Sequence, residues 1–158
     1  MTILETRRQH WPDEAACAAS AERLARHDAL RDAYIELHGP LGAGKTTWAR
    51  HLLHALGIAG RIKSPTYTVM EPYDATLNGA PLAVSHFDFY RFDDPQEWED
   101  AGFRDVFAGS GLKLAEWPEK AEELLPEPDL QITIEPGPGD ERHATLAAHT
   151  ARGVALLA

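Results

Sequence analysis

The chain has 158 residues, of which 44% are hydrophobic and 25% charged, and its formal net charge is −10. This length and composition predict a single folded domain over residues 1–158 and exclude two ordinary domains. No apolar run approaches the roughly 20 residues of a membrane span, and the acidic balance argues against DNA or RNA binding by this chain alone.

The first half of the chain predicts a helix, a strand and a second helix. Residues 12–27 are rich in alanine, and Pro12 stands where a first helical turn accepts proline, which predicts a helix. Residues 33–38 alternate and stop at a glycine, which predicts a strand. Residues 46–56 carry apolar side chains at helical spacing and are followed by Gly57, a typical helix stop.

Strands are expected to dominate the second half. Residues 67–71 contain β-forming side chains, and residues 74–81 read as a turn-rich loop. Further strands are predicted at 82–89, 112–116, 130–135 and 143–149, and helices at 94–97 and onward and at 118–125; residues 151–158 stay unassigned. This order predicts an α/β fold with a central, mainly parallel sheet, antiparallel additions at one edge, and flanking helices.

Residues 39–46, GPLGAGKT, match the phosphate-loop pattern G-x-x-x-x-G-K-[ST], and a predicted strand and helix flank them. The glycines let successive N–H groups point at phosphate oxygens, and the following helix presents its positive end to the same anion. Lys45 reaches the β- and γ-phosphates, and the Thr46 hydroxyl is suited to Mg2+. We therefore predict an ATP and Mg2+ site with nucleotide contacts from Gly39, Leu41, Gly42, Ala43, Gly44, Lys45, Thr46 and Thr47.

Two acids are candidates to complete this site, because a phosphate loop needs a carboxylate to hold Mg2+ or its waters. Asp88 follows the apolar stretch 82–87 and is the leading candidate, and the alternative is a turn or cap aspartate. Glu116 ends the strand 112–116 and is a second magnesium ligand, a group that orients the attacking water, or a helix-start acid. Lys45, Asp88 and Glu116 are the candidate catalytic residues, and Thr46, Asp88 and Glu116 the candidate metal ligands.

For Trp117 and Thr66 the sequence leaves two interpretations open. Trp117 either stacks on the adenine or packs beside Pro118. Thr66 lies in the hydroxyl-rich stretch 64–68, which is either a γ-phosphate sensor or a simple turn.

Four blocks together resemble the TsaE (YjeE) family, whose members are small bacterial ATPases of tRNA threonylcarbamoyladenosine synthesis. The blocks are GPLGAGKT at 39–46, SPTYTV at 64–69, HFDFYR at 86–91 and EWPEK at 116–120, in the family's order over roughly residues 12–147. The resemblance implies a P-loop NTPase fold, weak ATPase activity, and Asp88 as the Walker-B-like acid. It also implies that Glu116 is the second acid, Thr66 the switch-loop threonine and Trp117 a tryptophan near the nucleotide.

The resemblance also implies partners and a biological role. These are TsaD and TsaB, which modify tRNAs reading codons that begin with A, and ATP hydrolysis by this subunit resets their complex. The chain then meets tRNA only through the complex, without a membrane or DNA partner. The single cysteine, Cys17, and the lack of an apolar leader agree with a cytoplasmic location.

Three rival functions remain to be weighed. A small-molecule or nucleoside kinase is disfavoured because the arginines after residue 64 are too dispersed for a lid. A GTPase is disfavoured because no Asn-Lys-x-Asp block is present. A nucleotide-gated binding module without essential hydrolysis stays open.

Overall fold

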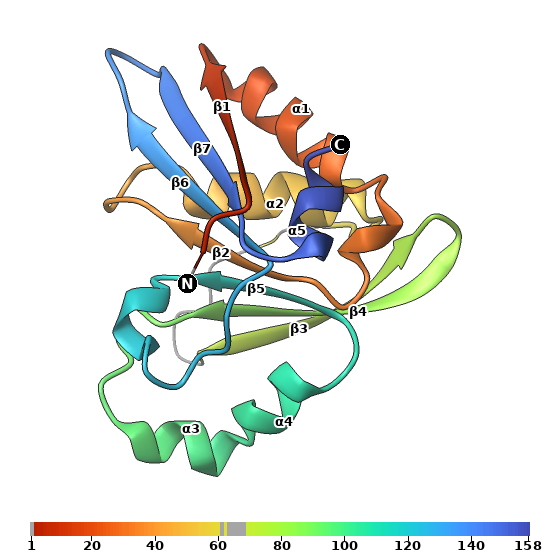
Figure 1. Ribbon diagram of the computed structural model, residues 1–158, viewed down its shortest axis with the longest axis vertical. Coiled ribbons are helices and arrows are strands. Elements are labelled where there is room, and N and C mark those ends of the chain that lie inside the picture. Colours follow the sequence, from red (N-terminus) through yellow and green to blue (C-terminus); the bar gives the residue numbers. More distant parts are fainter. Residues whose placement is uncertain (1, 61, 63–68) are drawn as a thin grey trace.

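The computed structural model describes residues 2–60, 62 and 69–158. Its strands form one seven-stranded sheet in the order β1-β7-β6-β2-β5-β4-β3 (Figure 1). The strands are β1 (Glu5–Trp11), β2 (Tyr34–His38), β3 (Met70–Leu77), β4 (Ala80–Asp88), β5 (Leu112–Glu116), β6 (Leu130–Pro136) and β7 (Arg142–Ala148). The mixed α/β class predicted from the sequence is confirmed.

The centre of the sheet is parallel and both of its edges are antiparallel. Strands β6, β2, β5 and β4 run parallel, as the sequence predicted. Strands β7 and β1 add antiparallel pairs at one edge, and β3 adds another at the far edge beside β4. The expectation of antiparallel strands at one edge only is therefore wrong.

The difference arises at residues 74–81, where the turn-forming composition predicted a loop. They belong to a β3–β4 hairpin whose two-residue turn is Asn78–Gly79, with φ of 48° and 81°. Positive φ at both turn residues matches the right-handed twist of paired strands, and asparagine followed by glycine is the sequence best suited to it. The hairpin places β3, which contains Pro72, at the sheet edge where proline is tolerated.

Helices cover both faces of the sheet (Figure 1). The helices are α1 (Glu14–Leu24), α2 (Lys45–Ala55), α3 (Pro95–Ala101), α4 (Phe103–Ala108) and α5 (Ala151–Leu156), with 3-10 turns η1 (Asp28–Leu30) and η2 (Pro118–Ala121). Helices α1 and α2 share one core with the aliphatic side of the sheet, and α3 and α4 enclose an aromatic core on the other side. None of the described helices is long and apolar enough to cross a membrane.

Strand alternation explains the two cores. In β2, Ile35 and Leu37 enter the aliphatic core beneath α1 and α2, whereas Tyr34 enters the aromatic core. The same period of two in β4 sends Val84 to the first core and Phe87 to the second. Asp88 and Glu116 stand at the ends of β4 and β5, so the same alternation decides which face of the sheet their side chains reach.

Candidate functional site

The phosphate loop joins the end of β2 to the start of α2, as the sequence predicted. Gly39 has φ of 147°, and a Cβ added there would lie 2.4 Å from the carbonyl oxygen of Ile134 in β6. Gly42 and Gly44 also have positive φ, at 80° and 106°. These glycines are therefore required by the path of the backbone, since a side chain at Gly39 would push the loop away from the sheet.

Lys45 is buried at the first turn of α2. Its ammonium donates hydrogen bonds to the carbonyls of Gly39 and Pro40, and it lies 3.5 Å from the centroid of the Trp117 ring. Burial lowers the pKa of Lys45, and the charges of Glu116 and other nearby acids oppose that shift. The lysine is thus a desolvated cation held against its own loop, which is the state in which a nearby anion is attracted most strongly.

The two candidate acids lie side by side at the ends of neighbouring parallel strands. The register pairs Asp88 of β4 with Glu116 of β5. Thr46 Oγ1 donates a hydrogen bond of 2.7 Å to Glu116 Oε1, which joins the first turn of α2 to the strand ends. Asp88 Oδ1 accepts a 3.0 Å hydrogen bond from the backbone N–H of Tyr90. One hydroxyl and two carboxylates thus gather at a single place, and these are the oxygen ligands that Mg2+ prefers.

Glu116 has a further buried neighbour, His86, which was not among the predicted site residues. His86 Nε2 lies 2.7 Å from Glu116 Oε2, and the side chains of both residues are almost completely buried. Because a carboxylate only accepts hydrogen bonds, the shared proton belongs to the imidazole. The sequence held a signal for this contact, since His86 precedes Asp88 by two positions in a predicted strand and so shares its face.

These groups line a pocket of about 380 Å³ on one side of the phosphate loop, which we call the acid-side pocket. Its lining comprises Leu41, Gly42, Ala43, Gly44, Lys45, Thr46, Thr47, Asp88, Tyr90, Glu116 and Trp117. The structure therefore brings together every described residue of the predicted site except Gly39, which lies behind the loop against β6. Thr66 lies outside the described residues.

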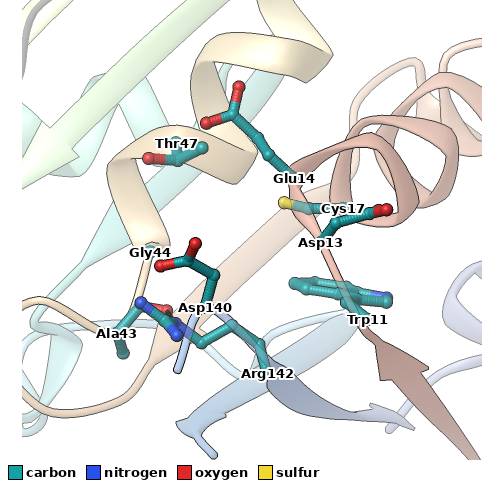
Figure 2. Close-up of a pocket in the computed structure, with 9 residues that line it drawn as sticks. All are labelled: Trp11, Asp13, Glu14, Cys17, Ala43, Gly44, Thr47, Asp140 and Arg142. Atoms are coloured by element: carbon teal, nitrogen blue, oxygen red, sulfur yellow. Dashed lines mark hydrogen bonds between the residues drawn. The ribbon is translucent and has the colours of Figure 1, made fainter. Parts of the chain in front are cut away.

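A second pocket, of about 320 Å³, opens on the other side of the same loop, and we call it the turn-side pocket. Figure 2 shows its side chains coming from the end of β1, the first turns of α1, the phosphate loop with the start of α2, and the β6–β7 turn with the start of β7. The lining residues are Trp11, Asp13, Glu14, Cys17, Ala43, Gly44, Thr47, Asp140 and Arg142. The two pockets share Ala43, Gly44 and Thr47, so they meet across the loop and the start of α2.

Two contacts define the wall of the turn-side pocket. Arg142 Nε donates a 3.0 Å hydrogen bond to the carbonyl of Ala43, which ties the start of β7 to the phosphate loop. Burial raises the pKa of the Cys17 thiol to about 12, and the charge of Glu14 adds to the shift while Arg142 opposes it. A protonated thiol is a weak nucleophile, so Cys17 provides an unreactive, largely apolar surface.

Comparison with known proteins gives a consistent result. A family model described as "Threonylcarbamoyl adenosine biosynthesis protein TsaE" matches residues 11–144. The tRNA threonylcarbamoyladenosine biosynthesis protein TsaE of Haemophilus influenzae is 38% identical over 98% of this chain and 97% of its own length. The protein of the same name from Bacillus subtilis is 41% identical over 72% of this chain and 68% of its own.

A solved structure resembles the whole fold. The crystal structure of YdiB from Bacillus subtilis superposes with a TM-score of 0.78 at 30% identity, covering 99% of this chain and 95% of that one.

Proposed function

The chain belongs to the TsaE family, and from this premise we propose that it is a Mg2+-dependent ATPase subunit of tRNA threonylcarbamoyladenosine biosynthesis. In this proposal it acts in the cytoplasm with TsaB and TsaD, contacts tRNA only through them, and resets their complex by hydrolysing ATP. The tRNAs concerned are those reading codons that begin with A. The observation that carries the ATPase proposal is the contact of Thr46 with Glu116, beside Asp88 and in the same pocket as Lys45.

The described side chains fit the phosphates of a nucleotide and a magnesium ion. Lys45 is the desolvated cation for the β- and γ-phosphates, with the start of α2 directed at the same place. Thr46, Asp88 and Glu116 would hold Mg2+, which would neutralise charge on the phosphate oxygens. Glu116, oriented by its hydrogen bonds to Thr46 and His86, would position the attacking water in line with the bond to the leaving oxygen.

The cation and the acids lie on one side of the phosphate loop, and this placement indicates where the nucleoside would bind. The γ-phosphate end belongs with Lys45 and the acids in the acid-side pocket, so the α-phosphate points toward Thr47 and the shared wall of the loop. The adenosine would then occupy the turn-side pocket, against Trp11 and Cys17 and beside Arg142. In this pose Trp117, whose ring centroid lies 3.5 Å from Lys45 Nζ, stands near the phosphates, and stacking on the adenine is not part of the proposal.

Slow hydrolysis by the isolated protein follows from the lining of the acid-side pocket. Among the described residues of that lining there is no arginine to stabilise charge on the transferred phosphoryl group. An arginine at that position is worth on the order of a thousandfold or more in rate. A partner that supplies one would therefore accelerate hydrolysis by a similar factor.

The rival functions receive unequal support. In a kinase, arginines close over both substrates, but Arg104 pairs with Glu99 and Arg142 binds the loop carbonyl of Ala43. The binding module without essential hydrolysis uses the same nucleotide contacts, so it is separated from the ATPase by experiment only. We therefore keep it as the alternative to be tested.

The test is phosphate release from MgATP by the purified protein, alone and with TsaB and TsaD. We expect a slow rate that rises in the presence of the partners and disappears in Lys45→Ala. A rate that stays unchanged on adding the partners would remove the proposed stimulation. A rate that survives in Lys45→Ala would show that the activity comes from a contaminant or another site.

Glu116→Gln separates hydrolysis from binding, because it keeps the size of the side chain and an oxygen that can hold Mg2+, and removes the charge proposed to position the attacking water. We expect MgATP to bind this variant while phosphate release falls by about a hundredfold or more. Full support of tRNA modification by this variant would favour the nucleotide-gated module over the ATPase.

A further inference from the structure

A cluster of two histidines and one glutamate lies outside both pockets. His10 of β1 and His143 of β7 are direct partners in the antiparallel register, and Glu141 stands at the end of the β6–β7 turn next to them. The neighbours Trp11 and Ala144 enter the aliphatic core, so strand alternation sends both imidazoles to the opposite face. There they are 52% and 57% exposed.

The geometry of the three side chains is compact. The two imidazole rings stack with centroids 4.9 Å apart and an angle of 19° between their planes. Both Nε2 atoms approach the same carboxylate oxygen, Glu141 Oε1: that of His10 as a hydrogen-bond partner, and that of His143 at 3.3 Å. One ligand atom from each of the three residues lies within 4.8 Å of the other two. In a tetrahedral zinc site with bonds of about 2.0–2.1 Å, ligand atoms are about 3.3 Å apart, so small side-chain rotations would close the set around an ion.

We propose that His10, Glu141 and His143 bind a divalent transition-metal ion of the Zn2+ type. Two imidazole nitrogens and one carboxylate oxygen form a donor set that suits Zn2+ and is poorly suited to Mg2+, which takes oxygen ligands. Three protein ligands leave the fourth position to water. A shallow depression of about 250 Å³, lined in part by His10, His143 and Thr145, gives a hydrated ion access to the cluster.

A simple ion pair accounts for the cluster less well. An ion pair needs only one imidazole against the carboxylate, whereas both rings here converge on Glu141 Oε1. A metal ion between the three groups would use both rings and the carboxylate at once. Arg8 also lines the depression, and its positive charge opposes cation binding, so the site depends on the negative charge of Glu141.

The experiment is a calorimetric titration of Zn2+ into the protein, purified without a histidine tag and kept in an excess of Mg2+. The Mg2+ saturates the oxygen ligands of the nucleotide site, so that the zinc measured is held by imidazole. We expect saturable binding of one Zn2+ per chain, weakened by at least about tenfold in each of His10→Ala, His143→Ala and Glu141→Gln. His54→Ala, which removes an exposed histidine of α2, is the matched control and should bind as the original chain does.

Nuclear magnetic resonance of the unmodified protein provides a second measurement that does not depend on the folding of a variant. Substoichiometric Zn2+ should shift the ring signals of His10 and His143 together, and leave those of His54 in place. The absence of saturable binding, equal binding by His143→Ala, or zinc-induced shifts confined to other histidines would each overturn the proposal. Any of these results would identify the cluster as a surface ion pair.

Discussion

Glu116 is positioned by two side chains that approach its carboxylate from different elements. Thr46 of α2 reaches one oxygen and His86 of β4 reaches the other, each at 2.7 Å. The His86 ring is fully buried, and its second nitrogen, Nδ1, has no hydrogen-bond partner among the described residues. A buried polar atom left without a partner costs free energy. The unpartnered Nδ1 atom is consistent with a histidine whose role is its contact with Glu116 through Nε2.

The first prediction concerns this contact. Replacing His86 by leucine leaves the Glu116 carboxylate buried with one hydrogen bond fewer, so we expect the free energy of unfolding to fall by about 1–3 kcal/mol. Phosphate release should also fall, because Glu116 loses its fixed orientation. His86→Gln retains an N–H donor of similar reach and should recover part of both losses. Urea denaturation and steady-state kinetics measure the two effects.

Ser85→Ala is the matched control for this prediction, since Ser85 neighbours His86 in β4 but points to the other face of the sheet. It should change stability by less than about 0.5 kcal/mol. If His86→Leu loses stability while phosphate release per folded molecule stays unchanged, His86 is structural and does not position Glu116.

At the scale of elements, most strands were predictable and the polar first strand was not. The runs that became β2, β5 and β6 were all identified because their alternation is strong. Strand β1 was missed because its sequence, ETRRQHW, is almost entirely polar and has one face open to solvent. Helix α5 was missed because its six residues carry no distinctive pattern, although Leu156 is buried by packing that only the fold provides.

The α-helix predicted at 118–125 is also not formed. The sequence predicted a short helix there, and the chain forms a single 3-10 turn, η2, that begins after Trp117 in a left-handed conformation with φ of 55°. Two prolines at 126 and 128 prevent continuation, and too few residues remain to form a stable α-helix. Local propensity alone does not reveal such an outcome.

The second prediction concerns the docking of α5. Gly153 faces the backbone of the segment before β6, where an added Cβ would lie 1.9 Å from the carbonyl oxygen of Asp129. Gly153→Ala therefore has to displace α5 from the sheet, and we expect a loss of about 2–3 kcal/mol in the free energy of unfolding. Thermal or urea denaturation measures it.

Arg152→Ala provides the comparison on the same helix. The Arg152 side chain is 45% exposed and approaches Asp129 at only 3.8 Å, so its removal should cost less than about 1 kcal/mol. Equal losses for the two variants would contradict the argument from close backbone approach.

At the scale of the whole molecule, the sheet gathers segments that are far apart in sequence. Residues near 45, 88 and 116 meet because three parallel strands end at the same edge of the sheet. This meeting was predictable once the phosphate loop and two acid-ended strands had been recognised. The turn-side pocket was not predictable, because it needs β1 and the β6–β7 turn to come together across the loop, and no short motif encodes that proximity.

The third prediction follows from ligand binding to the folded state alone. If MgATP occupies the site, a concentration of 100 times its dissociation constant should add about 2.7 kcal/mol to the free energy of unfolding. Removal of Mg2+ by a chelator should abolish most of that gain, as should Lys45→Ala. Urea denaturation with and without MgATP measures it, and an equal gain in Lys45→Ala would place the nucleotide elsewhere.

The pairing of the first strand with the last also governs how the chain is made. Glu5 of β1 pairs with Ala148 of β7, so nothing synthesised before β7 can complete that edge of the sheet. At about 5–20 residues per second, a ribosome takes on the order of ten seconds to pass from one to the other. During that interval β1 has no ladder partner, and its two arginines and one histidine keep it hydrated. The polar character that hid this strand from prediction thus protects the nascent chain from premature association.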